Sequence, residues 1–302
     1  MTVADRAVLL IINQRRAEAT AVARDVIDEL RQAGIDVRMS HSDAEATDHQ
    51  DVSIVDESDP MAAVGCELAV VLGGDGTILR AAEMVHASAV PVLGVNLGHV
   101  GFLAEAERND VATVVAAVVQ RQWTVEERLT LDVRVYRGDD TEFETFALNE
   151  VSIEKTVRER MLDLIVEVDG RPLSRWGCDG VICATPTGST AYAFSAGGPV
   201  VWPDVEALLL VPISAHALFS RPLVVAPSGT LAVELPVGSE AVLWADGRRG
   251  HEVQPGSRIE VTRHSHPVRI ARLNQAPFTD RLVAKFQLPV NGWRGLGGEA
   301  AG

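Results

Sequence analysis

Uncharged apolar runs and amphipathic stripes alternate along the first third of the chain. Strands are predicted at residues 7–13, 35–39, 68–72 and 90–95. The run at 68–72 has no charge and lacks the period-2 alternation of a half-exposed strand, so it predicts a buried strand. Helices are predicted at residues 18–33, which end at Gly34, at 78–84, and from Asn109, the expected cap, to about Gln120. Strands that alternate with helices predict an α/β domain over residues 1–123, with a doubly wound, Rossmann-like parallel sheet.

The pattern changes near Trp123. Apolar and polar residues alternate at 129–136 and 162–168, and short strand patterns recur between Gly, Pro and Asp signals as far as residue 273. This predicts an all-β domain over residues 124–275. A last helix at 279–286 is expected to return to the first domain within a C-terminal segment, 276–302, whose Gly-rich end from residue 291 is expected to fray. Residues 41–60, acidic and poor in large apolar groups, predict a surface loop.

Composition narrows the class of protein. The chain has 302 residues, 47% of them hydrophobic, a net charge of −15 and three cysteines without a CxxC pair. The negative charge argues against a general nucleic-acid or anionic-membrane binder, and the sparse cysteines predict buried thiols in a reduced, cytoplasmic protein. No targeting segment is recognised. The uncharged stretch 84–104 contains Pro91 and several glycines, so it is not expected to form a membrane-spanning helix.

The main candidate for chemistry is the Gly-Gly-Asp-Gly-Thr sequence at residues 73–77, here called the glycine turn. A strand, a glycine-rich turn and a helix can hold phosphate, because bare backbone N–H groups and the helix dipole favour an anion. Asp75 would repel that anion unless it binds a metal or accepts a proton, which are both kinase roles. The alternative is an ordinary turn in which Asp75 only caps the helix.

Three further stretches carry candidate binding residues. Residues 94–103 follow a strand at the same sheet edge, where Phe102 can stack on a base, or they form only a glycine-rich connector with a core Phe. Residues 147–150 place Asn149 and Glu150 within a predicted strand, where an amide suits adenine and a carboxylate suits ribose; a turn between two strands is the alternative. Residues 179–199 combine a strand, a Pro-Thr-Gly-Ser-Thr turn and a Gly-Gly-Pro sequence, which suits an anion or a nucleotide better than a plain loop.

Several other motifs are missing. The chain has no Gly-Lys dipeptide and therefore no Walker P-loop, no GxGxxG after a strand and no HExxH. His264 and His266 form a lone HxH, which is more often a surface feature than a zinc site.

Taken together, GGDGT at 73–77, LNE at 148–150 and DGVICATPTGSTAYAFSAGGP at 179–199 resemble the NAD kinase family, over roughly residues 68–290. The TPTGSTAY part discriminates, because lipid kinases and phosphofructokinases have motifs related to GGDGT. The resemblance implies transfer of a phosphoryl group from ATP or polyphosphate to the 2′-hydroxyl of the adenosine ribose of NAD, giving NADP. It also implies a divalent metal (Mg²⁺), a cytoplasmic location and a homodimer or homotetramer.

Carried over residue by residue, the resemblance makes Asp75 catalytic and gives Gly74 and Gly76 backbone contacts to phosphate. It places Phe102 near adenine, and it places Asn149 and Glu150 in contact with adenine and ribose. It also places Asp179 in contact with the nicotinamide-side ribose; in many members of the family this aspartate comes from a neighbouring subunit. The residues that would line the adenine and nicotinamide pocket are Thr187, Thr190, Ala191, Tyr192 and Ser195. Arg80 and Arg160 are basic positions in some members.

One stretch departs from the family pattern. Many members have a Gln soon after the Asp-Gly at 246–247, where this chain has Arg248 and Arg249, and Arg249 can take over a pyrophosphate contact. No cluster of acidic residues lies in a motif, so Mg²⁺ is expected to bind through the donor phosphates and not through a protein metal site. A lipid kinase of the same superfamily and a non-catalytic NAD-binding regulator remain as alternatives.

Overall fold

The computed structural model describes residues 6–97, 101–104, 106–107, 111–273 and 277–290. The chain divides into two units, described separately here. The α/β unit comprises Met1–Glu126 and Arg269–Gly302, and the β unit comprises Glu127–Val268. The predicted class, an α/β domain followed by an all-β domain and a final helix, is confirmed.

The α/β unit is built on one sheet with the strand order β3-β2-β1-β4-β5-β20-β7, and β6 also pairs with β5. The pairs among β1 to β6, and that between β5 and β20, are parallel. The strands are β1 (Ala7–Ile12), β2 (Asp36–Ser40), β3 (Ser53–Val55), β4 (Leu68–Leu72), β5 (Val92–Asn96), β6 (Ala106–Glu107), β7 (Thr124–Arg128) and β20 (Val268–Arg272). The helices are α1 (Ala17–Gln32), α2 (His41–Thr47), α3 (Asp75–Val85), α4 (Val111–Gln120) and α6 (Phe278–Phe286), with a 3₁₀ turn η1 (His86–Ser88).

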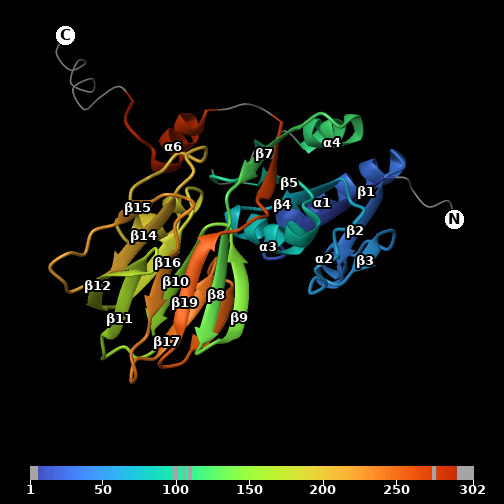
Figure 1. Ribbon diagram of the computed structural model, residues 1–302. Helices are drawn as coiled ribbons and strands as arrows, with labels where there is room; N and C mark the ends of the chain where they lie inside the picture. Colours follow the sequence, from blue (N-terminus) through green and yellow to red (C-terminus); the bar gives the residue numbers. More distant parts are fainter. Residues whose placement is uncertain (1–5, 98–100, 105, 108–110, 274–276, 291–302) are drawn as a thin grey trace, which may run out of the picture. The chain divides into compact units, whose positions relative to one another are not determined.

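Helices pack on this sheet through the apolar faces that the sequence predicts. One core joins the buried faces of α1 and α4 to alternate residues of β1, β4 and β5. Figure 1 shows α1 and α3 beside the strands of this sheet. Helix α3 packs on β5, where a Cβ at Gly94 would lie 2.5 Å from the Ile78 side chain. The predicted cap Asn109 lies outside the described residues, as does the tail from residue 291.

The prediction of a loop over residues 41–60 is wrong, because the segment contains α2 and β3. The Ser40 hydroxyl caps α2 by accepting a hydrogen bond from the backbone N–H of Asp43 at 3.2 Å. The Asp43 side chain is fully buried and paired with Arg80. The segment has few large apolar residues, which suggested a loop, but the buried Asp43–Arg80 ion pair stabilises its structure instead.

The β unit consists of two six-stranded sheets, ordered β15-β14-β13-β10-β17-β18 and β12-β11-β16-β19-β8-β9, with antiparallel pairing. Its first strands are β8 (Leu131–Arg137), β9 (Asp140–Ala147), β10 (Glu150–Lys155), β11 (Leu162–Val168), β12 (Arg171–Cys178) and β13 (Gly180–Ala184). The 3₁₀ turn η3 (Gly188–Thr190) and helix α5 (Tyr192–Ser195) follow. The remaining strands are β14 (Leu208–Ile213), β15 (Leu223–Val225), β16 (Leu231–Glu234), β17 (Ala241–Ala245), β18 (Arg249–Val253) and β19 (Arg258–Arg263). One apolar core joins the facing sides of the two sheets.

The sequence places β7 and β20 in the β domain, but the structure places both in the sheet of the α/β unit. The division therefore falls at 126/127 and 268/269, whereas the sequence suggests 123/124 and 275/276. Apolar spacing shows that a strand is half buried or buried, but it does not show which sheet the strand joins.

Two further expectations concern single features. The three cysteines are buried free thiols, as predicted. Within the described residues, none of the helices combines the length and the apolar character that crossing a bilayer requires.

Candidate active site

Asp75 is the first residue of α3 and follows β4 directly after the glycines. Gly74 is the N-cap residue, and no side chain caps the helix. The Asp75 carboxylate instead accepts the backbone N–H of Phe102 at Oδ2 and that of Leu103 at Oδ1, both at 3.1 Å. The side chain is half-buried. Asp75 is therefore held by the segment after β5, and it does not cap α3, contrary to the structural alternative.

Glycines shape the space on both sides of Asp75. A Cβ at Gly101 would lie 2.4 Å from Asp75 Oδ1, so only glycine lets this segment approach the carboxylate. At Gly74 and Gly76, by contrast, a Cβ would meet no atom within 4 Å. The backbone of the glycine turn therefore borders open space at the N-terminus of an eleven-residue helix, where an anion is favoured.

Arg80, a predicted basic site residue, is committed to contacts inside the α/β unit. Its Nε donates to Glu57 Oε1 at 2.6 Å, Nη1 to Asp43 Oδ1 at 3.0 Å, and Nη2 to Ser40 Oγ at 3.1 Å. These carboxylates raise the pKa of Arg80 above its already high value, although burial opposes the change. The structure favours a role in joining α3 to α2 and β3 over contact with phosphate.

Phe102 is 9% exposed and packs on two rings of α6. Its ring centroid lies 5.9 Å from that of Phe278 and 5.7 Å from that of Phe286. In this state, α6 covers the ring that was expected to stack on a base. His99 and Val100 of the same motif lie outside the described residues.

In the β unit, Asn149 lies in the short connection between β9 and β10, and Glu150 is the first residue of β10. The predicted placement within a strand is therefore wrong for Asn149, which lies between two strands as in the turn alternative, and it is confirmed for Glu150. Asp246, in the turn between β17 and β18, holds this connection. Its Oδ2 accepts the N–H of Leu148 at 3.0 Å, and its Oδ1 accepts that of Asn149 at 2.7 Å. The hydrogen bonds to the buried Asp246 side chain keep this backbone ordered even though it is not part of a continuous strand.

Glu150 and Asp246 are buried carboxyl groups, 7% and 6% exposed. Burial, reinforced by the negative charge of Asp246, raises the pKa of Glu150 to about 8, against a smaller effect of the Tyr192 N–H that donates to it. Burial also raises the pKa of Asp246, although its backbone donors and Arg249 oppose the change. Glu150 therefore keeps its proton to a higher pH than an exposed carboxyl group does, and in its protonated form it offers both a donor and an acceptor.

The Thr-Pro-Thr-Gly-Ser-Thr turn lies against the Asn149 backbone. The Thr185 N–H donates to Asn149 O at 2.9 Å, and a Cβ at Gly188 would lie 2.0 Å from the same oxygen. The predicted pocket residues differ in exposure: Thr187 is buried, Thr190 and Ala191 are half-buried, and Tyr192 and Ser195 are exposed. The turn thus fixes the connection that carries Asn149 and leads into Glu150, the first residue of β10.

A pocket of about 400 Å³ opens beside this connection. Its lining residues are Glu150, Ser152, Glu154, Tyr192, Trp244, Asp246 and Gly247. The two aromatic side chains are 36% and 40% exposed, for Tyr192 and Trp244. Carboxyl groups beside aromatic rings suit the hydroxyls and the base of a nucleoside and oppose a phosphate.

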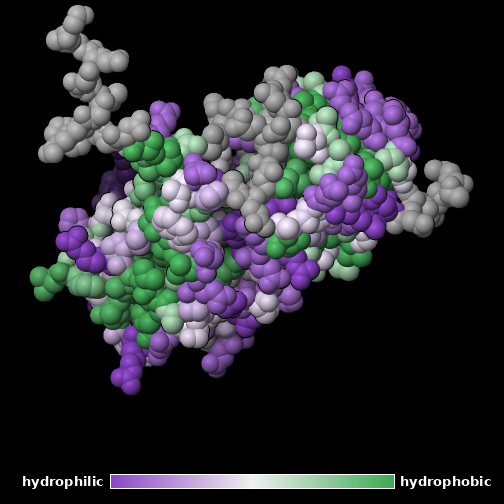
Figure 2. Space-filling view, turned by 90° about the horizontal axis from the view of Figure 1, so that it is seen from above, coloured by the Kyte–Doolittle hydropathy of each residue, from purple (hydrophilic) through white to green (hydrophobic). Residues whose placement is uncertain are grey.

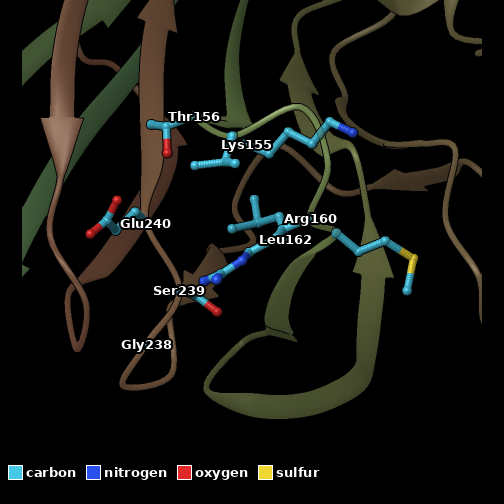
Figure 3. Close-up of a pocket in the computed structure, with 9 residues that line it drawn as sticks. Lys155, Thr156, Arg160, Leu162, Gly238, Ser239 and Glu240 are labelled. Atoms are coloured by element: carbon cyan, nitrogen blue, oxygen red, sulfur yellow. The ribbon is translucent and has the colours of Figure 1, made fainter.

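Two other predicted residues lie away from that pocket lining. Asp179 Oδ1 lies 2.5 Å from Lys155 Nζ, and this lysine lowers the pKa of Asp179. Arg160 is exposed and lines a separate pocket of about 120 Å³ with Lys155, Ser239 and Glu240 (Figure 3). The structure does not bring Arg160 to the pocket that contains Glu150 and Tyr192.

Arg249 supports Asp246. Its Nη2 donates to Asp246 Oδ2 at 3.0 Å and to Phe146 O at 2.7 Å, and its guanidinium carbon lies 4.5 Å from the centre of the Phe146 ring. These contacts favour a structural role over the predicted contact with pyrophosphate.

Sequence reasoning missed Asp246, Trp244 and Gly101 as parts of these sites. Asp246 and Gly247 carried a signal, since an Asp-Gly dipeptide between two strands predicts a hairpin turn with positive φ, and φ is 53° and 62° here. Nothing local indicates that this turn reaches Asn149.

Within the described part of the chain, no group of three His, Cys, Asp or Glu side chains is placed to hold a metal ion. Among the described residues of the glycine turn, Asp75 offers one carboxylate, and two backbone N–H groups already bind it. The donor set therefore suits a cation that arrives on phosphates and does not suit a metal site made of protein ligands.

Comparisons with known proteins agree with the resemblance. Family models described as the ATP-NAD kinase N-terminal and C-terminal domains match residues 8–123 and 148–273. The chain belongs to the NAD kinase family. It is thus a phosphotransferase, and the predicted recognition and enzyme class are confirmed.

Relatives extend this family match over nearly the whole chain. An NAD kinase of Thermobifida fusca is 57% identical over 305 residues, which cover 98% of this chain and 93% of that protein. NAD kinase 2 of Streptomyces coelicolor is 57% identical over 294 residues, covering 96% and 97%.

Solved structures support the fold. A yeast NADH kinase complexed with NADH has a TM-score of 0.84 at 23% identity and covers 94% of this chain and 88% of its own. An NAD kinase from Archaeoglobus fulgidus in complex with ATP has a TM-score of 0.69 at 26% identity and covers 93% and 98%.

Proposed function

We propose that this phosphotransferase moves the terminal phosphoryl group of ATP to the 2′-hydroxyl of the adenosine ribose of NAD, giving NADP. The observation that carries the proposal is the Asp75 carboxylate, held by two backbone N–H groups beside an open glycine turn. Phosphoryl transfer leaves a protein mainly with positioning and charge stabilisation, and both require such fixed groups.

Asp75 is proposed as the general base. A ribose hydroxyl is a poor nucleophile near neutral pH, so a carboxylate within hydrogen-bond reach must orient it and accept its proton. Each Asp75 oxygen accepts one backbone N–H and keeps further acceptor capacity. The two N–H groups fix the rotation of the carboxylate, so the hydroxyl meets an acceptor whose direction is already set.

The glycine turn is proposed to bind the donor phosphates. Gly74 and Gly76 border open space, and the N-terminus of α3 favours negative charge. Mg²⁺ is proposed to arrive on these phosphates, where it would neutralise part of their charge. ATP is proposed as the donor, a proposal supported by the Archaeoglobus NAD kinase structure in complex with ATP, and polyphosphate is an alternative donor for this chain.

The adenosine of NAD is proposed to bind in the β unit, at the pocket beside Glu150. Tyr192 supplies an aromatic face, and the protonated Glu150 carboxyl group can both donate to and accept from ribose hydroxyls. The other residues proposed to contact NAD are Asn149, Thr187, Thr190, Ala191 and Ser195.

Asp179 is proposed to meet the nicotinamide-side ribose of NAD bound to a neighbouring subunit, so the active form would be a homodimer or homotetramer in the cytoplasm. Asp179 is half-buried and keeps access to solvent beside Lys155. The β unit also exposes large apolar residues such as Trp202, Leu218 and Phe219, and apolar side chains are visible on the face drawn in Figure 2. A second copy would cover such surface.

The proposal is tested by incubating the purified chain with NAD and Mg²⁺ and either ATP or polyphosphate, and then measuring NADP with an NADP-specific dehydrogenase. NADP formation that depends on NAD and a donor is the expected result. Phosphorylation of a lipid, or NAD binding without NADP formation, would contradict it. Light scattering of the active sample should show a mass above that of a 32.4 kDa monomer.

A further inference from the structure

The backbone that holds Asp75 is itself held by the C-terminal helix α6. Arg281 Nη1 donates to the carbonyl oxygen of Phe102 at 3.3 Å. That carbonyl belongs to the same peptide group as the Leu103 N–H, which donates to Asp75 Oδ1 at 3.1 Å. One peptide group therefore accepts from a guanidinium at one end and donates to the proposed base at the other.

The chemistry of this arrangement is directional. A positive charge on a peptide carbonyl draws electron density away from the N–H, and hydrogen bonds in such a chain strengthen one another. The Leu103 N–H therefore binds the Asp75 carboxylate more firmly, and the peptide plane is fixed at both ends. Loss of Arg281 would leave this N–H in place but weaken its hold on the direction of the carboxylate.

Side-chain packing reinforces the same contact. Phe278 and Phe286, also on α6, pack against the Phe102 ring, and Phe102 donates its own N–H to Asp75 Oδ2. None of the α6 residues is fully buried, and these aromatic and arginine interactions join the helix to the segment after β5. A second arginine completes the support, because the buried Arg272 donates to Leu103 O at 3.2 Å.

From these contacts we propose that Arg281 is a positioning residue for the phosphoryl transfer, acting on Asp75 through the Phe102–Leu103 peptide. The inference rests on the proposed function, since it requires Asp75 to be the base. It makes α6 part of the catalytic apparatus of the α/β unit, although no residue of α6 needs to touch either substrate.

The test uses three variants of the full chain. Arg281→Met keeps the apolar stem but removes the donors, Arg281→Lys keeps a positive donor, and Lys285→Ala removes a positive charge from an exposed position of the same helix. Arg281→Met should lower kcat roughly tenfold, less than the hundredfold loss that a 1 Å misplacement of a catalytic group can cause. The KM for NAD should stay within about twofold, because the proposed NAD contacts lie elsewhere. Arg281→Lys should recover most of the turnover, and Lys285→Ala should match the parent.

Two further readouts separate positioning from mere stability. The ¹⁵N amide signal of Leu103 should shift in Arg281→Met and not in Lys285→Ala. In an Asp75→Asn background, Arg281→Met should cause no additional loss of turnover, because the group through which it acts is gone. An equal loss in both backgrounds, or unchanged kcat in Arg281→Met with a shifted thermal midpoint only, would overturn the positioning role.

The outcomes also separate this inference from the proposed function. A slow Asp75→Asn together with a normal Arg281→Met overturns the role of Arg281 alone. Normal turnover in Asp75→Asn overturns the proposed function, and the role of Arg281 fails with it.

Discussion

Asp75 of the α/β unit and Asp246 of the β unit are both held by backbone N–H groups, yet their surroundings differ. Asp75 accepts two such bonds, is half-buried and stands beside glycines that border open space. Asp246 accepts N–H groups of Leu148 and Asn149, is 6% exposed and is paired with Arg249.

The difference indicates two roles for the same chemical group. A carboxylate that keeps acceptor capacity and access to open space can take a proton from a substrate. A carboxylate that is buried and surrounded by donors instead fixes the backbone that binds it. Asp75 is therefore proposed to act on the substrate, and Asp246 to shape the connection that carries Asn149 and leads into Glu150.

The largest effect is expected from Asp75→Asn, which keeps the shape but removes the proton acceptor. If Asp75 is the general base, kcat should fall by about 10²–10⁴-fold, measured as NADP formation at saturating substrates. The thermal midpoint, taken on the same preparation, should fall less than in Asp246→Asn, because the new amide group also faces a backbone N–H but at a half-buried site. Turnover within threefold of the parent would remove Asp75 from the mechanism.

Gly101→Ala should displace the Asp75 carboxylate while leaving the residue itself in place. The new Cβ would lie 2.4 Å from Asp75 Oδ1, so the carboxylate or the backbone must move. Because misplacement by about 1 Å can cost about a hundredfold, kcat should fall by roughly 10- to 100-fold. Gly177→Ala is the matched control, since its Cβ would meet its nearest neighbour, Met161, at an ordinary 3.4 Å. Equal turnover in the two variants would show that the close approach of Gly101 is unimportant.

Asp246→Asn should mainly affect stability and NAD binding. The new amide group would face a backbone N–H where the carboxylate now accepts, leaving a buried donor unsatisfied at a cost of about 2–3 kcal/mol. Urea unfolding should show this loss, and the KM for NAD should rise while kcat stays within about threefold. A fall in kcat like that of Asp75→Asn at unchanged stability would erase the difference between the two aspartates.

Tyr192→Ala should weaken NAD binding more than it slows turnover. Stacking of a base on an aromatic ring is worth about 1–3 kcal/mol, and 1.4 kcal/mol is a factor of about ten in affinity. Steady-state kinetics should therefore show a roughly tenfold higher KM for NAD. An unchanged KM would mean that the exposed Tyr192 ring does not contact the substrate.

The last prediction concerns stability alone: Glu150→Gln should change the pH dependence of stability. The pKa of Glu150 is raised from 4.5 to about 8 in the folded protein, so the folded state binds more protons between these values and stability falls as pH rises through that window. The variant removes this dependence. At pH 9 its thermal midpoint should be higher by several degrees, at about 2–4 °C for each kcal/mol. Parallel curves for both proteins from pH 5 to pH 9 would contradict the raised pKa.

Local patterns in the sequence predicted much of the fold. The uncharged run of β4, the glycine turn and the amphipathic α1 are each readable within a short window, because burial, turns and helical faces leave local signals. The catalytic candidate Asp75 followed from its position between glycines. The alternating strands of the β unit were recognisable for the same reason.

The remaining features depend on residues far apart in the sequence. Asp246 binds the N–H of Asn149, 97 positions away, and Leu103 binds Asp75, 28 positions away. Strand β20 joins β5 after the whole β unit has intervened. Helix α2 is stabilised by the ion pair between the buried Asp43 and Arg80. The acidic composition of this segment, which is typical of a loop, gives no sign of that pair.

The most direct test of the division between the two units is the affinity for NAD of Asp75→Asn and Tyr192→Ala, measured by calorimetry without a phosphoryl donor and compared with their single-turnover rates. The account predicts that Asp75→Asn binds NAD within about threefold of the parent yet turns over at least about a hundredfold more slowly. Tyr192→Ala should instead lose about tenfold in affinity and keep most of its single-turnover rate at saturating NAD. If Asp75→Asn loses affinity for NAD by as large a factor as it loses turnover, Asp75 is a binding residue and not the base.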